Sequence, residues 1–590
     1  MIRSPLRPLT KILKAREEGL NPDFIEAEEK VRRLRSKIIK EKFKATQRIY
    51  ILIGFLLLSF SMVALKMTAL ASKVPDYLAS SGYEKRFHGK RATISDRNGA
   101  VLATNITTHS VYVHPYELIE KKVLALKLSE IFTDLNSKKL EKSFNDGRKF
   151  VWIKKQVSPE QQQAIRDLGQ PGIYFGSRET RLYPNGRFAS HVLGGSTFGG
   201  IGVDSAELIG QAGIELSFDS YLKDPMNYDK PLSLSLDMSV QAIIEKVLEA
   251  GIKIMNAKGG SAVLMNVHNG QILSMTSLPD FDPNNRPPPP LVGDPADSPL
   301  FNRAAQGIYE LGSTFKIFTV AQVLEQEIAD VSTIIDIRGP IYLGKRFSIS
   351  DHHYLGEELS VSDIIIKSSN IGTAKLAAMI GGRNQKLFLE KLGLLDQTTI
   401  ELPEAKKAKP QRPENKKWSK SNTATISYGY GISVSPLHLA AAYSTIVNGG
   451  VKVFPTLLSD NAKLQRSRQV ISVETSAKLQ EMLKQVVENG TAKGAKITGY
   501  SVGGKTGTAE KVNFANGGYI KDKVITTFVA TFPMEAPKYV LVVTLDEPED
   551  RNMDKPIRTA GWTAVPVARE IISRIAPVLG IPPKMKGSDY

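Results

Sequence analysis

Ser313 and Lys316 are the residues whose types and spacing best suit covalent catalysis. On a helix, positions i and i+3 lie on one face about one turn apart. A neutral lysine amine there can accept the serine proton, which makes the hydroxyl a nucleophile. The spacing recurs at Ser220 and Lys223 in a polar segment, whereas Ser313 follows Gly312 at the start of a predicted buried helix. The dipole at a helix start favours an anionic oxygen, so the sequence favours Ser313.

The composition narrows the choice of nucleophile. The chain has no cysteine, which excludes disulfides, thiolate zinc sites and cysteine nucleophiles. The eight histidines show no HExxH spacing, and adjacent His352 and His353 cannot share one face of an element. We therefore expect an oxygen or amine nucleophile, with no metal and no cofactor.

A second lysine, Lys505, permits two interpretations. Gly499 to Thr506 matches GxxxxGK[ST], and Tyr539 to Glu547 resembles the strand of a nucleotide-binding site that ends in an acidic residue. A P-loop needs a buried strand before it and a helix after it, but the upstream residues are polar and several glycines follow. The alternative is that Lys505, Thr506, Gly507 and Thr508 form an edge strand beside the serine.

A Ser-x-Asn triplet would supply the remaining groups, and the chain has three: Ser143 to Asn145, Ser368 to Asn370 and Ser459 to Asn461. We choose Ser368 and Asn370, because they lie between an aliphatic run and an apolar helix. The last triplet follows a proline-containing strand, where Ser-Asp-Asn is common in turns. Ser368 could instead merely cap a helix.

The elements that must position these residues are predicted as strands and helices in mixed order. Two hairpins are indicated, at Asn98-Gly99 and around His268 to Gly270. The proline-rich stretch 283–299 is predicted to be a loop. Further expected elements are strands at 232–237, 261–266, 271–277, 524–532 and 539–545 and helices at 239–253, from 313, and at 564–579. The sequence thus predicts an α+β fold with an antiparallel sheet covered by helices.

The N-terminal 71 residues predict a membrane anchor. Residues 1–48 contain 14 Lys/Arg and 7 Asp/Glu, so they hold +7 of the chain's +18. An apolar run from Ile49 to Leu65 follows and is just long enough to span a bilayer. Basic residues on its N-terminal side predict a cytoplasmic N-terminus and an exported remainder. We expect an uncleaved single-pass anchor, and no nucleic-acid partner.

The ordered motifs Ser-Thr-Phe-Lys, Ser-Ser-Asn and Lys-Thr-Gly-Thr resemble those of the serine penicillin-binding protein and β-lactamase superfamily. Residues 91–103, Arg181 to Pro184 and Gly213 to Glu215 also look like class B penicillin-binding proteins. The resemblance covers about residues 90–570, and within the class it is greatest to the division-specific transpeptidases. The elongation-specific transpeptidases are the close alternative. A membrane-bound β-lactam sensor, a β-lactamase and a P-loop NTPase are more remote.

The resemblance implies a peptidoglycan D,D-transpeptidase that acts through a serine acyl-enzyme. Ser313 would attack a stem peptide ending in D-Ala-D-Ala, and an amine of a second stem peptide would accept the acyl group. Lys316 would be the base. Ser368 would relay a proton and Asn370 would hold Lys316 and the substrate amide. The donor's terminal carboxylate would bind Lys505, Thr506 and Thr508, next to Gly507, and N–H groups of Ser313 and Thr508 would form the oxyanion hole.

The resemblance also implies an organisation and a location. We expect a basic leader (1–48), a transmembrane anchor (49–71), a β-rich, dimerisation-like pedestal (72–230), a transpeptidase domain (231–580) and a tail (581–590). The expected place is the bacterial inner membrane, with the catalytic domain in the periplasm at the division septum. Partners would be peptidoglycan stem peptides, β-lactam antibiotics, a membrane glycosyltransferase and division proteins.

Overall fold

The computed structural model describes residues 9–71, 90–198, 208–344, 348–414, 418–460, 468–513, 517–550 and 556–584. The chain forms two compact units, Met1–Arg86 and Phe87–Tyr590. Most of the tail predicted at 581–590, and Asn461 of one Ser-x-Asn candidate, lie outside the described residues.

The first unit is a pair of helices. Helix α1 (Leu9–Glu17) packs on the start of α2 (Pro22–Ala71), where Lys11 and Glu29 form an ion pair of 2.7 Å. Within α2, the 22 residues Gln47–Thr68 have a mean hydropathy of 2.2, and their most apolar part is fully exposed. This segment is long and apolar enough to cross a membrane, and it contains the predicted run from Ile49 to Leu65.

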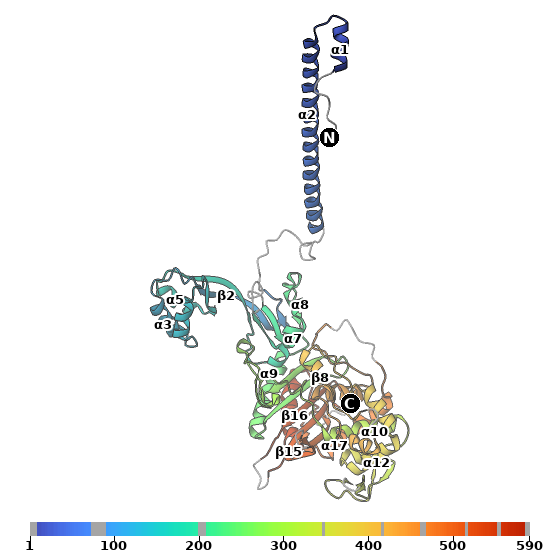
Figure 1. Ribbon diagram of the computed structural model, residues 1–590. Coiled ribbons are helices and arrows are strands. Elements are labelled where there is room, and N and C mark those ends of the chain that lie inside the picture. The colour runs from blue at the N-terminus through green and yellow to red at the C-terminus, as the bar shows by residue number, and fades with distance from the viewer. Residues whose placement is uncertain are drawn as a thin grey trace. The chain divides into compact units, whose positions relative to one another are not determined.

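The second unit begins with a sheet built on the long strand β2 (Val101–Val113). One end of β2 pairs with β1 (Ile94–Ser95) across the predicted Asn98-Gly99 turn, and β1 pairs in parallel with β7 (Leu232–Ser233). The other end carries a small lobe with its own hydrophobic core (Figure 1). The lobe adds α3 (Lys121–Ile131), α4 (Ser137–Asn145), β3 (Val151–Val157), α5 (Pro159–Asp167) and β4 (Ile173–Leu182). The sequence analysis did not predict this lobe.

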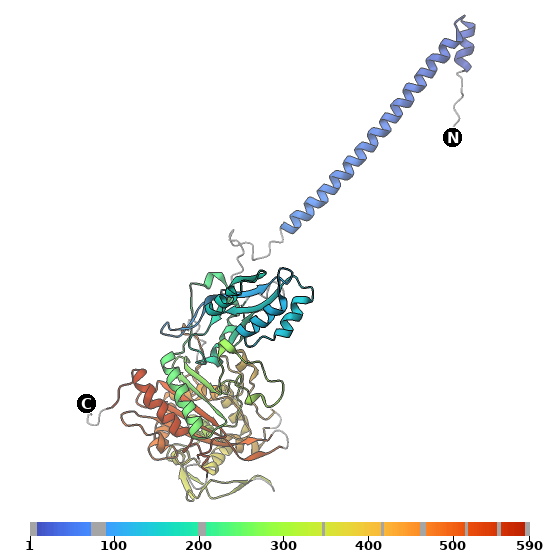
Figure 2. The same cartoon turned by 90° about the vertical axis from the view of Figure 1, so that its left-hand side faces the viewer.

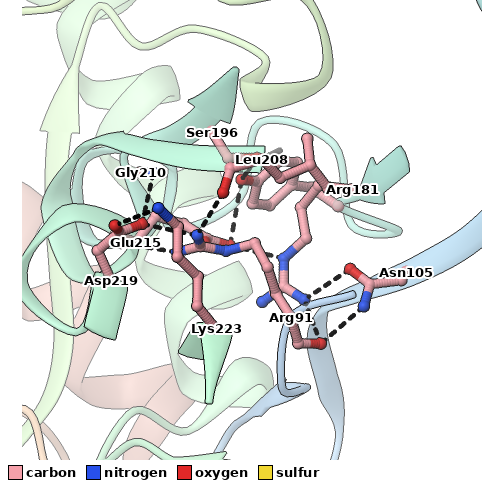
Figure 3. Close-up of polar contacts among 10 residues, drawn as sticks. Arg91, Asn105, Arg181, Ser196, Leu208, Gly210, Glu215, Asp219 and Lys223 are labelled. Carbon is pink, nitrogen blue, oxygen red and sulfur yellow. Dashed lines mark hydrogen bonds and ion pairs between the residues drawn. The ribbon is translucent and has the colours of Figure 1, made fainter. Parts of the chain in front are cut away.

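Buried charges join the segments at the base of this sheet (Figure 3). Glu215 accepts hydrogen bonds from Arg91 Nε at 2.8 Å and Arg181 Nε at 2.7 Å, and all three side chains are almost fully buried. Arg91 also pairs with Asp219 at 2.6 Å. The surrounding elements are α6 (Ser190–Leu193), β5 (Gly195–Phe198), β6 (Leu208–Ala212), α7 (Gly213–Ser217), α8 (Asp219–Lys223) and the 3-10 turn η2 (Pro225–Asn227).

The rest of the second unit is a five-stranded antiparallel sheet between two layers of helices (Figures 1 and 2). The strand order is β14-β15-β16-β8-β9, so β14 is an edge strand. Helices α9 (Met238–Ile254) and α18 (Ala564–Val578) pack side by side on one face, and α16 (Pro436–Val447) and α17 (Val473–Glu488) pack on the other. The strands are β8 (Gly259–Asn266), β9 (Ile272–Leu278), β14 (Gly503–Val512), β15 (Tyr519–Phe532) and β16 (Tyr539–Asp546).

Most strands and helices predicted for this region are confirmed, with two differences. The helix expected to begin at Ser313 begins as a 3-10 turn, η5 (Gly312–Phe315), and continues as α10 (Lys316–Glu325). The strand expected at 232–237 shrinks to the two residues of β7, because Asp237 already caps α9. The proline-rich loop is confirmed and holds two short 3-10 turns, η3 (Pro283–Asn285) and η4 (Pro295–Asp297).

The remaining elements of the second unit are short. The helices are α11 (Val361–Ile366), α12 (Asn370–Ile380), α13 (Gly382–Lys391), α14 (Pro403–Lys407), α15 (Lys420–Ser427) and the 3-10 turn η7 (Lys493–Ala495). The strands are β10 (Ile334–Asp336), β11 (Ile341–Tyr342), β12 (Ser348–Ile349) and β13 (Glu358–Ser360).

Candidate active site

The turn η5 carries Ser313 at the boundary between the core and solvent. Ser313 is partly exposed, whereas Gly312, Thr314 and Phe315 are buried. A hydrogen bond from the core fixes the turn: the buried Tyr443 hydroxyl donates to the Thr314 carbonyl at 2.7 Å. The lysine of the motif, Lys316, is fully buried at the first position of α10. A 3-10 turn brings positions i and i+3 to the same side, so it serves the Ser-x-x-Lys spacing as well as the predicted helix does.

Strand β14 brings the second lysine to the same place. Residues 505 to 508 pair with Val529 to Thr526 of β15, and the strand continues to Val512 where a P-loop would begin a helix, so the P-loop interpretation is wrong. The turn and the strand approach closely. A Cβ atom on Gly507 would lie 2.3 Å from the Leu311 carbonyl oxygen, and one on Gly312 would lie 2.8 Å from the Thr508 carbonyl oxygen. Only glycine permits this contact, which sets the Thr508 backbone beside the Ser313 turn.

Both buried lysines converge on Ser368. Ser368 Oγ accepts hydrogen bonds from Lys316 Nζ at 3.1 Å and from Lys505 Nζ at 2.9 Å. Lys316 Nζ also donates to the Ser368 carbonyl oxygen, and Lys505 Nζ to the Thr506 carbonyl oxygen at 3.1 Å. A hydroxyl that accepts two hydrogen bonds has no lone pair left, so its own proton is free to be donated to a third group.

The protonation of the two lysines follows from their burial. Burial lowers the pKa of Lys316 well below its usual value, and the neighbouring Lys505 charge lowers it further. Burial also lowers the pKa of Lys505, to about 7. A neutral Lys316 amine has two N–H bonds, both directed at Ser368, and a lone pair that can accept a proton.

The segment containing Ser368 has a strained backbone. Ser368 adopts a φ of +62°, which is rare for a residue with a side chain. The cap of α12 is Ser369, whose Oγ accepts from the Gly372 N–H at 2.9 Å. Ser368 is therefore not the helix cap that the sequence left as an alternative. Its conformation directs Oγ to the lysines instead.

Asp351, which the sequence analysis missed, clamps this segment. Its carboxylate accepts from the backbone N–H groups of Asn370 and Ile371 and from Ser369 Oγ, the last at 2.8 Å. The only sequence signal is an aspartate beside two histidines, which does not indicate a contact with the start of α12, 19 positions later. The Asp351 charge also raises the pKa of Lys316, against the larger effects of burial and Lys505.

One predicted contact is not formed. Asn370 was expected to hold Lys316, but its Nδ2 donates to the Ser350 carbonyl at 2.9 Å, while Lys316 binds Ser368. The physical reason is that Asn370 is the first residue of α12 and is drawn toward the Ser350–Asp351 segment. Its side chain thus supports the clamp rather than the lysine.

The predicted threonines already have protein partners. Thr506 Oγ1 shares a hydrogen bond of 2.8 Å with Thr491 Oγ1, and Thr508 Oγ1 accepts from the Ala560 N–H at 3.0 Å. Both hydroxyls are therefore fixed in orientation, and Thr508 keeps its own proton for donation.

The other motif copies lie elsewhere. Ser143 is in lobe helix α4, where it binds backbone carbonyls of its own helix. Ser459 Oγ donates to the carbonyl of Ser233 in β7 at 3.0 Å. Lys223 in α8 pairs with Asp219 at 2.8 Å. Of the described candidates, only Ser368 contacts the two buried lysines. Among the described residues no group of three metal-ligating side chains occurs.

Comparison with known proteins agrees with this arrangement. The family model for the penicillin-binding protein transpeptidase domain matches residues 260–573, and that for the penicillin-binding protein dimerisation domain matches residues 87–229. A probable peptidoglycan D,D-transpeptidase FtsI of Caulobacter vibrioides is 36% identical over 90% of this chain and 89% of its own. Peptidoglycan D,D-transpeptidase FtsI of Escherichia coli is 27% identical over 85% of this chain and 87% of its own.

A solved structure has the same fold. Penicillin-binding protein 3 of Mycobacterium tuberculosis, in complex with aztreonam, matches 84% of this chain and 97% of its own with a TM-score of 0.63 and 24% identity. The two matching family models together cover most of the second unit, and the first contains all three predicted motifs. The chain therefore belongs to the penicillin-binding protein transpeptidases.

Proposed function

We propose that this protein is a membrane-anchored D,D-transpeptidase that cross-links the stem peptides of peptidoglycan and is acylated by β-lactams. The observation that carries the proposal is the convergence of Lys316 and Lys505 on Ser368 Oγ, beside the turn that holds Ser313. Among the described residues Lys316 forms no ion pair with a carboxylate, and its pKa is lowered well below the usual value despite the nearby Asp351, as a general base requires.

The reaction then proceeds in two steps. Lys316 takes the Ser313 proton while Ser313 Oγ attacks the carbonyl carbon of the penultimate D-alanine. The Ser313 and Thr508 backbone N–H groups stabilise the oxyanion. Ser368 donates its proton to the departing nitrogen and takes the proton held by Lys316, so D-alanine leaves and Lys316 is neutral again. An amine of a second stem peptide attacks the acyl-enzyme, and Ser313 regains its proton as the new amide forms.

The donor's terminal carboxylate would be recognised at the other end of the site. Lys505 supplies the charge, Thr506 and Thr508 supply hydroxyl groups, and Gly507 lets the strand lie against the Ser313 turn. Asn370 would position the segment that contains Ser368. No cofactor or metal takes part in this scheme.

We assign the protein to the division septum rather than to lateral wall growth, with its N-terminus in the cytoplasm and its catalytic domain in the periplasm. The similarity to two FtsI transpeptidases over most of the chain supports the septal role, and the basic residues before Gln47–Thr68 support the orientation. A membrane glycosyltransferase and division proteins are the partners that we propose. The anchor, pedestal and transpeptidase domain would occupy residues 49–71, 72–230 and 231–580.

Covalent labelling tests the nucleophile and the relay serine. We expect fluorescent penicillin to label the membrane-bound protein, Ser313→Ala to abolish the label, and Ser368→Ala to slow it strongly. Ser459→Ala is the matched control from the competing triplet and should label normally. Labelling that survives Ser313→Ala, or that depends on Ser459 instead of Ser368, contradicts the assignment.

Two further measurements separate the remaining alternatives. A β-lactamase releases the hydrolysed drug within milliseconds to seconds, whereas a transpeptidase should hold the acyl group far longer. Depletion of the protein should give filamentous cells if its role is septal and round cells if it belongs to lateral elongation.

A further inference from the structure

A cavity that shares no residue with the site of Ser313 has no role in the proposed chemistry. Its volume is about 360 Å³, which is in the size range of small-ligand pockets. One wall comes from the base of the pedestal and includes His191 of α6 and Gln211 and Ala212 of β6. The other walls come from the proline-rich loop and from α14 of the transpeptidase domain. We call this space the base cavity.

The base cavity lies where the pedestal is bound to the transpeptidase domain. The Gly213 N–H donates to Glu404 Oε1 at 2.9 Å, and Ser217 Oγ donates to the Glu401 carbonyl at 2.6 Å. Both hydrogen bonds join α7 of the pedestal base to α14 or the residues before it. A ligand in the cavity would therefore contact both parts.

Two cations that line the cavity have no acidic partner. Arg286 Nε donates to the Gly194 carbonyl at 3.2 Å, and the guanidinium lies 5.3 Å from the centre of the Phe281 ring. The two terminal nitrogens of Arg286 have no hydrogen-bond partner among the described residues. Lys407 is exposed and forms no hydrogen bond or ion pair with any described residue. A guanidinium with two free nitrogens fits a carboxylate, and a second cation adds to the attraction.

Glu404 supplies an unused acceptor in the same cavity. Its Oε2 is buried and has no hydrogen-bond partner among the described residues. Burial lowers the pKa of Arg286 and the Glu404 charge opposes this effect, so the two charges lie near each other. They form no ion pair in the described structure, so each is available to a ligand. A buried acceptor without a partner is costly, and an N–H group of a ligand would satisfy it.

The remaining lining is neutral and largely apolar. Burial lowers the pKa of His191 to about 4, so its ring carries no charge at neutral pH. Phe281 and Phe301 add aromatic surface, and Pro289 and Pro290 add rigid apolar surface. The cavity thus suits a ligand with a carboxylate, an N–H donor close to that carboxylate and a small apolar side chain.

The carboxyl end of a short peptide carries these three groups on one residue. The terminal carboxylate matches the two cations, the N–H group of the last residue matches the free Glu404 oxygen, and an alanine methyl group matches the apolar wall. An inorganic phosphate or a lipid phosphate would match the cations only. It would also bring a second anion close to Glu404, which is unfavourable.

We propose that the base cavity binds the carboxyl terminus of a short peptide with small side chains, which is the chemistry of an uncross-linked stem peptide. Arg286 and Lys407 pair with the carboxylate, and Glu404 Oε2 accepts from the N–H group of the last residue. The link to stem peptides rests on the proposed function. The site itself goes beyond that function, because the peptide is bound there without being acylated or cleaved.

A titration with Nα,Nε-diacetyl-lysyl-D-alanyl-D-alanine tests the inference. The full-length protein is first acylated with penicillin, as checked by mass spectrometry, so that the catalytic site is closed to the peptide. We expect isothermal titration calorimetry to show saturable binding with a dissociation constant of about 0.1–1 mM. The peptide with a C-terminal amide should bind about tenfold more weakly, because the charge-assisted contacts of the carboxylate are lost.

Variants of the two cations locate the binding. Arg286→Gln and Lys407→Gln should each weaken binding about tenfold. Lys406→Gln is the matched control and should bind normally, since Lys406 is the neighbouring exposed lysine of α14 but is not among the residues that line the cavity.

Three results overturn the inference and leave the transpeptidase assignment intact. They are the absence of saturable binding to the acylated wild type, equal binding of the peptide and its amide, and normal binding by both Arg286→Gln and Lys407→Gln. An equal loss in Lys406→Gln and Lys407→Gln also overturns it, because the attraction would then be unspecific. If penicillin does not acylate Ser313, the proposed function fails, and the same titration of the unacylated proteins still decides the inference.

Discussion

In the proposed mechanism, the two buried lysines Lys316 and Lys505 must hold different protonation states in the same site. Lys316 must be neutral to accept the Ser313 proton, and its pKa is strongly lowered by burial and by the second lysine. Lys505 must be protonated to bind a carboxylate, and its pKa is about 7. Ser368 Oγ accepts from both amines, so it transmits the state of one lysine to the other.

This arrangement predicts a fall in acylation at alkaline pH. As the pH rises through about 7, Lys505 loses its proton and the attraction for the donor or β-lactam carboxylate is lost. Lys505→Arg carries a side chain that stays protonated, so its alkaline limb should move up by more than one pH unit even though its maximal rate is lower. The second-order rate constant for penicillin acylation between pH 6 and about 9.5 measures this. An identical alkaline limb in both proteins would show that another group titrates.

Asp351 predicts a mixed effect on rate and pH profile. Asp351→Asn removes the charge that ties the N–H groups of Asn370 and Ile371, so the strained Ser368 should be held less well and acylation should fall about tenfold. The same change removes a charge that raises the pKa of Lys316, so the acidic limb of the profile should move to lower pH. Asp336→Asn, at a partly exposed site in β10, is the control. A fall in the acylation rate without a shift of the acidic limb to lower pH would contradict an electrostatic role of Asp351.

At the scale of elements, the site depends on contact between the η5 turn and β14. Gly507→Ala would place a Cβ atom 2.3 Å from the Leu311 carbonyl oxygen, so the strand must move away from the turn. A displacement near 1 Å at a catalytic geometry costs about a hundredfold in rate. We expect penicillin acylation to fall by about that factor. Gly494→Ala is the control, since its Cβ would make only an ordinary contact of 3.4 Å with Val565. Normal acylation by Gly507→Ala would mean that the turn and strand tolerate separation.

Local patterns predict the elements well where they carry their own signals. Runs of strand-forming residues predicted β15 and β16, the Asn-Gly turn predicted the β8–β9 hairpin, and the apolar context favoured Ser368 among three triplets. Asp351 could not be found this way, because its contact with the start of α12 depends on tertiary folding across 19 positions. The lobe was missed because its short, mixed segments bury only one side each, around Val111, Leu128 and Phe144.

At the scale of the second unit, the two hydrophobic cores divide the chain differently from the sequence boundary near residue 230. The main core includes Ile94, Leu102 and Ile214 of the pedestal together with α9 and the five-stranded sheet. The lobe core is separate. The base of the pedestal should therefore unfold with the transpeptidase domain, whereas the lobe can unfold on its own.

The buried ion pairs of Glu215 test whether the base of the pedestal unfolds together with the transpeptidase domain. Glu215→Gln leaves two buried guanidinium groups without their shared carboxylate, and breaking a buried ion pair in this way costs about 3–5 kcal/mol. We expect the thermal transition that abolishes penicillin labelling to move to lower temperature. Glu130→Gln, at a solvent-exposed position of α3, should leave it unchanged. If Glu215→Gln melts the base without affecting labelling, the shared core does not make the two parts cooperative.

Phe132 tests whether the lobe can unfold independently of the transpeptidase domain. Its side chain is 2% exposed in the lobe core, and truncating a buried phenylalanine costs about 3–5 kcal/mol. In Phe132→Ala, limited proteolysis should cut within residues 106–176 at temperatures where the wild type resists, while penicillin still labels Ser313 at the normal rate. Leu126→Ala, on the same helix but 49% exposed, should resist like the wild type. If Phe132→Ala also loses penicillin labelling, the lobe is not an independent folding unit. The catalytic domain would then depend on the lobe for its stability.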